Sequence, residues 1–151
     1  MSRVHFVIDS DLCEVALVAM AVNTICIHLG LGKIQASEVE LCVAEAVTNS
    51  IRHAWRNERG HTVSVAVSAQ KDELQIDISD RGTPMGAEHI ERLHQVSQEA
   101  EPEKDDRLQL AEGGRGLQII HDLMDGAEYT SQEGMNRLRL IKRIPPPEAG
   151  R

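Results

Sequence analysis

Aromatic residues are scarce in this chain, at 2% of its residues. Proteins that bind single-stranded nucleic acid stack bases on such side chains, and they also need a basic surface for the phosphates. Basic residues are outnumbered here, 16 against 24 acidic ones, so the formal charge at pH 7 is -8. We therefore expect no direct nucleic-acid partner.

Membrane-spanning, secretory and zinc-binding patterns are also missing. No apolar run has the length needed to cross a bilayer, and the N-terminus lacks the cationic and apolar regions of a secretory signal. The histidines form no HExxH pattern and the cysteines no CxxC pair. Cys13, Cys26 and Cys42 all lie in apolar helical patterns, which predicts reduced core cysteines. The sequence favours a soluble cytoplasmic protein without a membrane partner.

The length of 151 residues suits one domain, which we place at residues 1–144. The PPPEAGR sequence that follows cannot pair in a sheet, so residues 145–151 are predicted to be a disordered tail. The order of the predicted elements indicates an α/β two-layer sandwich. Its mixed, mostly antiparallel sheet would be covered on one face by helices.

The elements themselves are predicted from hydrophobic periodicity and from capping signals. Capping boxes at Asp11 with Glu14 and at Ser37 with Glu40 predict where the first two helices begin. Alternating and helical patterns predict strands near residues 4–8, 63–67, 74–78, 127–131 and 137–144, and helices near residues 11–29, 37–55, 86–96 and 117–124.

The second of these helices carries Glu45, Asn49 and His53 at positions i, i+4 and i+8, which places them on one face. A carboxylate and a carboxamide one turn apart can serve a metal ion and a proton transfer. Taken alone, such a stripe is more often an ordinary solvated helix surface.

Two further motifs are ambiguous on their own. Asp80-x-Gly82 follows a strand and is a turn signal. Gly113, Gly114 and Gly116 lead into a helix, where free N–H groups suit a phosphate chain, although a flexible helix entry fits equally well. The acidic segment before these glycines is typical of a mobile lid or of a disordered loop.

The three motifs together resemble the GHKL ATPases, and among them the anti-sigma-factor serine kinases of bacterial partner-switching systems. EAVTN at residues 45–49 is similar to the family's N-box, SDRGTPM at 79–85 to its first glycine box, and GGRGLQIIHDLMD at 113–125 to its second. The sequence contains no P-loop, GxSxG elbow or protein-kinase HRD and DFG set. Pro84 stands where broader members often have a glycine, which favours the anti-sigma-factor branch over sensor histidine kinases.

The resemblance implies the Bergerat-type ATP-binding fold, with ATP and Mg²⁺ as cofactors. Asn49 would ligate Mg²⁺, for which an amide oxygen is suitable, and Glu45 would be the general base for the incoming hydroxyl. Asp80 would accept a hydrogen bond from the adenine amino group, and Gly82 would let the backbone pass close to the base.

The second glycine box would bind the phosphates. The resemblance assigns Gly113, Gly114 and Gly116 to the hinge and phosphate-binding edge of the lid, and it also places Arg115 and Leu117 at the cofactor. The Arg115 side chain could reach a phosphate or remain solvated.

As a whole, the resemblance implies a cytoplasmic protein-serine/threonine kinase that also acts as an anti-sigma factor. It would phosphorylate a small STAS-domain anti-anti-sigma protein, bind a sigma factor or another regulator, and form a homodimer. An alternative is an ATP-responsive switch that sequesters its partner with little or no kinase activity. A sensor histidine kinase is less favoured, because no pair of long helices with a phosphoacceptor histidine precedes the domain.

Overall fold

The computed structural model describes residues 3–94 and 115–147 of the chain. In this part, each predicted strand and helix is present within a few residues of its expected place. The elements, in chain order, are β1 (Arg3–Asp9), a 3-10 turn (Leu12–Glu14), α1 (Val15–His28), α2 (Lys33–Asn49) with a π-helical extension (Ser50–Ala54), β2 (Thr62–Gln70), β3 (Glu73–Asp80), α3 (Ala87–His94), α5 (Arg115–Leu123), β4 (Gly126–Gln132) and β5 (Met135–Arg143).

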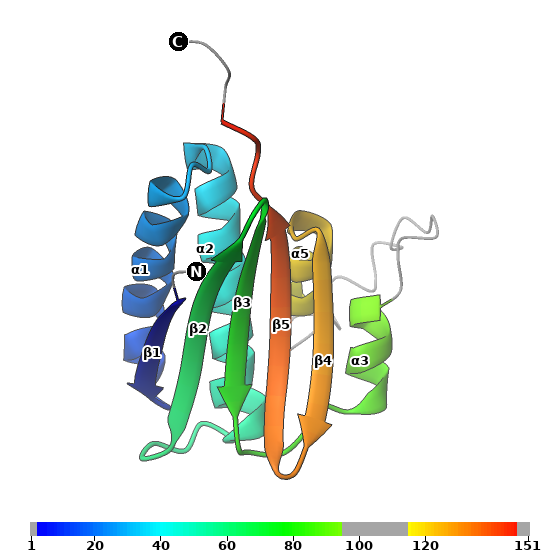
Figure 1. The fold of residues 1–151 in the computed structure, drawn as a ribbon. Coiled ribbons are helices and arrows are strands. Elements are labelled where there is room, and N and C mark those ends of the chain that lie inside the picture. The colour runs from blue at the N-terminus through cyan, green and yellow to red at the C-terminus, as the bar shows by residue number, and fades with distance from the viewer. Residues whose placement is uncertain (1–2, 95–114, 148–151) are drawn as a thin grey trace.

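The described strands form one sheet in the order β1-β2-β3-β5-β4. Figure 1 shows the helices on one face of this sheet, while no described helix covers the other face, which is called the open face below. The predicted two-layer α/β sandwich is therefore confirmed, but every neighbouring pair of described strands is antiparallel, whereas we expected a mixed sheet. The pairing of α1 with α2 explains part of this difference. The two helices together return the chain to the end of the sheet where β1 stopped, so β2 runs against β1.

The core lies between the sheet and the helices and is mostly aliphatic. Every second residue of β2 and β3 points inward, and Val65, Leu74 and Ile76 are fully buried. Because one face of α2 is buried against this sheet, the flank that carries its polar residues is held in a fixed position. The buried residues of α2 are Ala36, Val39, Cys42, Val43, Ala46 and Val47.

The last inward-facing residue of β5 is a buried lysine. Lys142 is 7% exposed, and its Nζ donates to the Leu123 carbonyl oxygen at 2.6 Å and pairs with Glu38 at 3.3 Å. A buried ammonium group is tolerated only with such partners. The contacts attach the C-terminal end of α5 to both β5 and α2.

The predicted start of α2 is wrong. The helix begins at Lys33, so Ser37 lies inside it and does not cap it. Glu40 instead accepts a hydrogen bond from Asn23 Nδ2 of α1 at 2.8 Å. Gly30, whose φ of +98° suits glycine, ends α1 tightly enough for the chain to re-enter a helix within a few residues.

The start of α1 agrees only in part with its predicted capping box. Asp11 accepts a hydrogen bond from the Cys13 backbone N–H at 3.0 Å, while Glu14 makes no capping bond. This turn leaves Cys13 exposed, so its predicted burial is wrong, whereas Cys26 and Cys42 are buried thiols as predicted. Burial raises the pKa of Cys26 to about 11 and that of Cys42 to about 12, so both stay protonated at neutral pH.

Among the described residues, no helix combines the length and the apolar character needed to span a membrane. The predicted tail is described only as far as Pro147, where the chain is exposed. Residues 148–151 lie outside the described residues, so the disordered tail stays a prediction.

Candidate functional site

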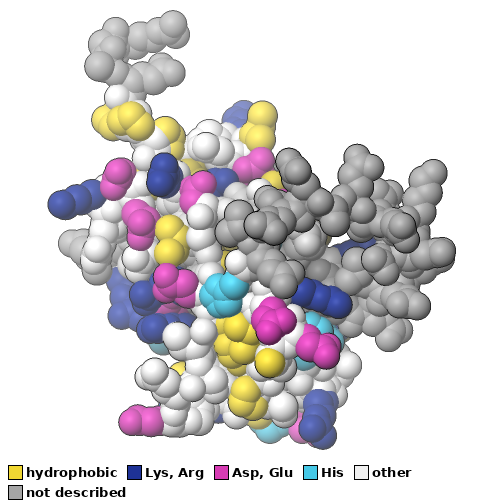
Figure 2. All heavy atoms as spheres, turned by 90° about the vertical axis from the view of Figure 1, so that its right-hand side faces the viewer, with side chains coloured by type: hydrophobic (Ala, Val, Ile, Leu, Met, Phe, Trp, Pro, Cys, Tyr) yellow, Lys and Arg dark blue, Asp and Glu magenta, His cyan; other side chains and the backbone are white. Residues whose placement is uncertain are grey.

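A cleft of about 270 Å³ lies between the C-terminal half of α2, the loop after β3, and the strands β4 and β5. Three residues predicted for the site, Asn49, Asp80 and Leu117, line this cleft although they are far apart in the sequence. Figure 2 shows the side of the molecule that carries α3, where apolar side chains are bordered by acidic and histidine side chains. An apolar cleft with a few converging polar groups is typical of a small-molecule site.

The carboxylate of Asp80 is held at the end of β3 by three hydrogen bonds. Its Oδ1 accepts from the Gly82 N–H at 3.0 Å and from Asn136 Nδ2 at 2.8 Å, and its Oδ2 accepts from Ser50 Oγ at 2.7 Å. An ionised carboxylate has about four acceptor positions. One position therefore remains for a donor that enters the cleft.

Asn136 is a site residue that the motifs did not predict. It is 2% exposed, and besides Asp80 its Nδ2 also reaches the Gly82 carbonyl oxygen at 2.9 Å. Its Oδ1 accepts from Ser131 Oγ at 2.7 Å, so both ends of the amide are satisfied. The available signal was a polar residue at an inward position of a strand whose next inward residue is Leu138.

Gly82 is required by the approach of two backbone segments. A Cβ at this position would collide with the carbonyl oxygen of Ala54, at the end of the π-helical turn. The Thr83 N–H donates to the same oxygen at 2.9 Å. The loop after β3 is therefore attached to the end of α2, which gives Gly82 a structural reason beside the predicted approach to a base.

We expect Gly82→Ala to destabilise the fold by about 1–3 kcal/mol, the usual cost of overpacking, because both colliding segments are backbone. Urea unfolding would measure the loss. Gly86→Ala in the same loop is the matched control, since its added Cβ meets nothing nearer than His89 Cδ2 at 3.8 Å. Equal midpoints for the two variants would contradict the assigned contact.

The predicted catalytic pair lies beside the first turn of α5. A Cβ at Gly116 would be 2.7 Å from Glu45 Oε2 and 3.3 Å from Asn49 Nδ2. The sequence separates these residues widely, but the fold brings Gly116 of the second glycine box against the carboxylate and the amide of the N-box. Among the described residues, neither Glu45 nor Asn49 has a side-chain hydrogen bond or ion pair, so both are available to a ligand.

The structure describes only some of the other residues of the second glycine box. Leu117 is 2% exposed and lines the cleft, and Arg115 is exposed at the start of α5. Gly113, Gly114 and the predicted lid lie outside the described residues. Their phosphate-binding role stays a prediction.

Two histidines and a tyrosine also line the cleft. His53 lines the cleft, with its ring centroid 6.3 Å from that of His89 on α3. Burial, and then the charges of His89 and Arg52, lower the pKa of His53, so its ring is neutral at pH 7. The Tyr129 hydroxyl accepts from the Met85 N–H at 2.8 Å and holds the loop after β3 against β4.

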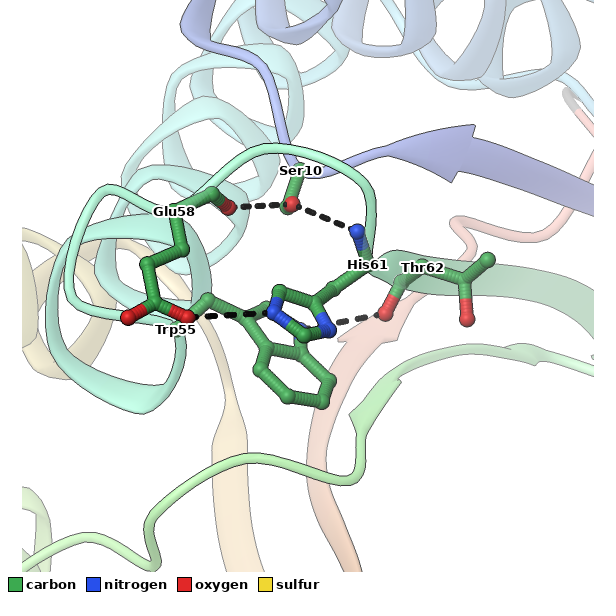
Figure 3. A network of polar contacts seen from close by, with 5 residues as sticks. All are labelled: Ser10, Trp55, Glu58, His61 and Thr62. Atoms are coloured by element: carbon green, nitrogen blue, oxygen red, sulfur yellow. Dashed lines mark hydrogen bonds and ion pairs between the residues drawn. The ribbon is translucent and has the colours of Figure 1, made fainter.

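The connection between α2 and β2 is held in place by the contacts drawn in Figure 3. The rings of Trp55 and His61 stack at 3.9 Å, and Trp55 Nε1 donates to the Thr62 carbonyl oxygen at 3.2 Å. Ser10 Oγ donates to the Glu58 carbonyl oxygen at 2.6 Å and accepts from the His61 N–H at 3.1 Å. These contacts stabilise the connection that follows the helix of Glu45 and Asn49.

The family model of the histidine kinase-like ATPase domain matches residues 8–142. The chain belongs to this family, as the three motifs predicted. An anti-sigma F factor of Oceanobacillus iheyensis is 35% identical over 97 residues, which cover 64% of this chain and 61% of that protein. The serine-protein kinase RsbW of Listeria innocua is 27% identical over 125 residues, or 81% of this chain and 75% of the relative. The match to the first relative thus spans less than two thirds of that protein.

Solved structures show the same fold. The RsbU and RsbW domains of Rv1364c from Mycobacterium tuberculosis match with a TM-score of 0.66 and 14% identity, over 97% of this chain and 34% of that one. The SiaB-SiaC complex from Pseudomonas aeruginosa matches with a TM-score of 0.60 and 15% identity, over 92% of this chain and 89% of that one. At these identities the likeness concerns the fold alone.

Proposed function

We propose that the chain is an ATP-dependent protein-serine/threonine kinase and anti-sigma factor of a bacterial partner-switching system. Its substrate would be a small STAS-domain anti-anti-sigma protein, and a sigma factor or another regulator would be its second partner. The names of the anti-sigma F factor and RsbW relatives support this proposal. A homodimer and a cytoplasmic location, where ATP is available, belong to the same proposal.

The observation that carries the proposal is the common cleft of Asn49 and Asp80, with Glu45 one turn from Asn49. Asp80, with its one remaining acceptor position, would bind the amino group of adenine. The first turn of α5, which carries the positive end of the helix dipole, would face the phosphates. The site therefore has one end for the base and one end for the triphosphate.

The Asn49 side chain suits a hard divalent cation, because its amide oxygen has no other partner among the described residues. Mg²⁺ held there would neutralise charge on the phosphates during transfer. Glu45 would take the proton of the substrate serine hydroxyl as its oxygen attacks the γ-phosphorus. The bond from this phosphorus to the bridging oxygen then breaks, giving ADP and a phosphoserine.

The test is transfer of labelled γ-phosphate to STAS-domain proteins encoded beside this gene. We expect Mg²⁺-dependent labelling of one of them, on a serine, and no labelling when that serine is replaced by alanine. EDTA should stop the reaction. ATP binding without transfer to any candidate would contradict the kinase and leave the ATP-responsive binding switch.

A further inference from the structure

The C-terminal end of α5 is attached to the sheet by backbone contacts. The Leu123 carbonyl oxygen, in the last turn of the helix, accepts from Lys142 Nζ at 2.6 Å. The Asp125 N–H donates to the Ile141 carbonyl oxygen at 2.9 Å, and the Asp125 carboxylate accepts from the Arg143 N–H at 2.7 Å. The end of α5 and the turn after it are therefore fixed to β5.

The opposite end of α5 is the end that contacts the site. Gly116 lies there against the side chains of Glu45 and Asn49. With a rise of about 1.5 Å per residue, Gly116 is about 10 Å from Leu123 along the helix axis. Because a short helix moves as a rigid unit, a tilt of about 6° at the attached end would displace the first turn by about 1 Å. The attachment at Leu123 therefore determines where the first turn lies.

Lys142 is an expensive residue for stability alone. It is 7% exposed, and the second partner of its Nζ is Glu38 on α2, at 3.3 Å, whose side chain is 32% exposed. Apolar residues of similar volume can often replace such a buried pair without loss of stability. A short hydrogen bond from a buried ammonium group to one carbonyl oxygen does, however, select one position for α5.

The inward side of β5 carries a polar residue toward each end. Asn136 and Lys142 are both buried, with the apolar Leu138 and Leu140 between them. Asn136 holds the Asp80 carboxylate, at the end of the cleft proposed for the base, at 2.8 Å. Lys142 holds α5, whose first turn lies at the end proposed for the phosphates. One strand is thus attached to both ends of the site.

We propose that Lys142 is a positioning residue for phosphate transfer, which holds the first turn of α5 against Glu45 through the Leu123 carbonyl oxygen. This role rests on the proposed kinase activity and extends it to a residue that does not line the cleft. Transfer depends on alignment of the reacting groups to within about 1 Å. ATP binding depends on it less, because the contacts of Asp80 with the base remain.

Lys142→Met tests the role by removing the ammonium group while keeping an unbranched side chain. We expect phosphate transfer to the STAS-domain protein to be between about 10- and 100-fold slower, with an ATP dissociation constant within about threefold of the wild type. Single-turnover transfer at saturating ATP measures the rate, and isothermal titration measures the affinity. Lys142→Arg, which keeps a cationic donor, should recover most of the rate.

Two variants of Glu38 separate positioning from stability. In Glu38→Gln the ion pair is lost, but Lys142 keeps its bond to Leu123, so the urea unfolding midpoint should fall while the transfer rate stays close to that of the wild type. Glu38→Met combined with Lys142→Met replaces the buried pair by apolar side chains. The double variant should be more stable than Lys142→Met alone and should transfer phosphate just as slowly.

Hydrogen exchange reports on α5 without any reaction. In Lys142→Met the backbone N–H groups of residues 119–123 should exchange faster, while those of β2 should not change. Unchanged exchange in α5, a wild-type transfer rate in Lys142→Met, or recovery of the rate in the double apolar variant would overturn the positioning role. A wild type that transfers phosphate to no candidate protein would overturn the proposed function instead.

Discussion

Replacing Asp80 by asparagine is expected to weaken ATP binding by about 100-fold or more, because it removes a charged acceptor from a partly buried site. Three donors already converge on this carboxylate, from Gly82, Asn136 and Ser50. An amide in its place has only one oxygen, so its NH₂ group must face either one of these donors or the amino group of the base. Isothermal titration with ATP measures the change.

The matched control is Asp77→Asn, on the same strand. Asp77 lies on the open face of the sheet and forms a bidentate pair with Arg139, at 2.8 and 3.0 Å. Its replacement should lower stability slightly and leave ATP affinity unchanged. Unfolding midpoints of both variants show whether each protein is folded during the titration. If Asp80→Asn is unfolded, Ser50→Ala, which removes one of the three donors, should still weaken ATP binding measurably. An ATP affinity of Asp80→Asn close to that of the wild type would contradict the proposed base contact.

Local chemistry made most of the fold predictable. The alternation of Val63, Val65 and Val67 gives a strand whatever surrounds it, because period-two burial suits only an extended chain on a one-sided sheet. The stripe of Glu45 and Asn49 was predictable as a helix face for the same kind of reason. The function of this stripe was not predictable from its spacing, since the polar residues of an ordinary solvated helix surface have the same spacing.

The features that were not predicted from the sequence depend on tertiary contacts, which no local sequence pattern contains. Asn136 joins Asp80 only because β5 pairs with β3 in a register that places the two residues opposite each other. Gly82 meets Ala54 because the π-helical turn carries the end of α2 under the loop after β3. The start of α2 was misplaced because the tight turn after α1 outweighs a capping signal at Ser37.

Glu45→Gln is expected to retain ATP affinity and to lower phosphate transfer by about 10²–10⁴-fold, the usual contribution of a general base. The amide has nearly the same shape as the carboxylate but does not accept a proton at neutral pH. The side chain lies against Gly116, where a larger or displaced group would disturb α5. Glutamine is therefore a sharper test than alanine, which would also leave a gap there. Single-turnover transfer of phosphate to the unphosphorylated STAS-domain protein measures the rate.

Glu40→Gln on the same helix is the control. Glu40 faces α1 through its bond with Asn23, away from the cleft, so its replacement should leave both affinity and transfer unchanged. The comparison with Asp80→Asn then divides the site into two functions. Asp80→Asn should lose nucleotide and, with it, transfer, whereas Glu45→Gln should lose transfer alone. The same defect in both variants would mean that the two carboxylates share one role, and the assignment of base recognition to β3 and proton transfer to α2 would be wrong.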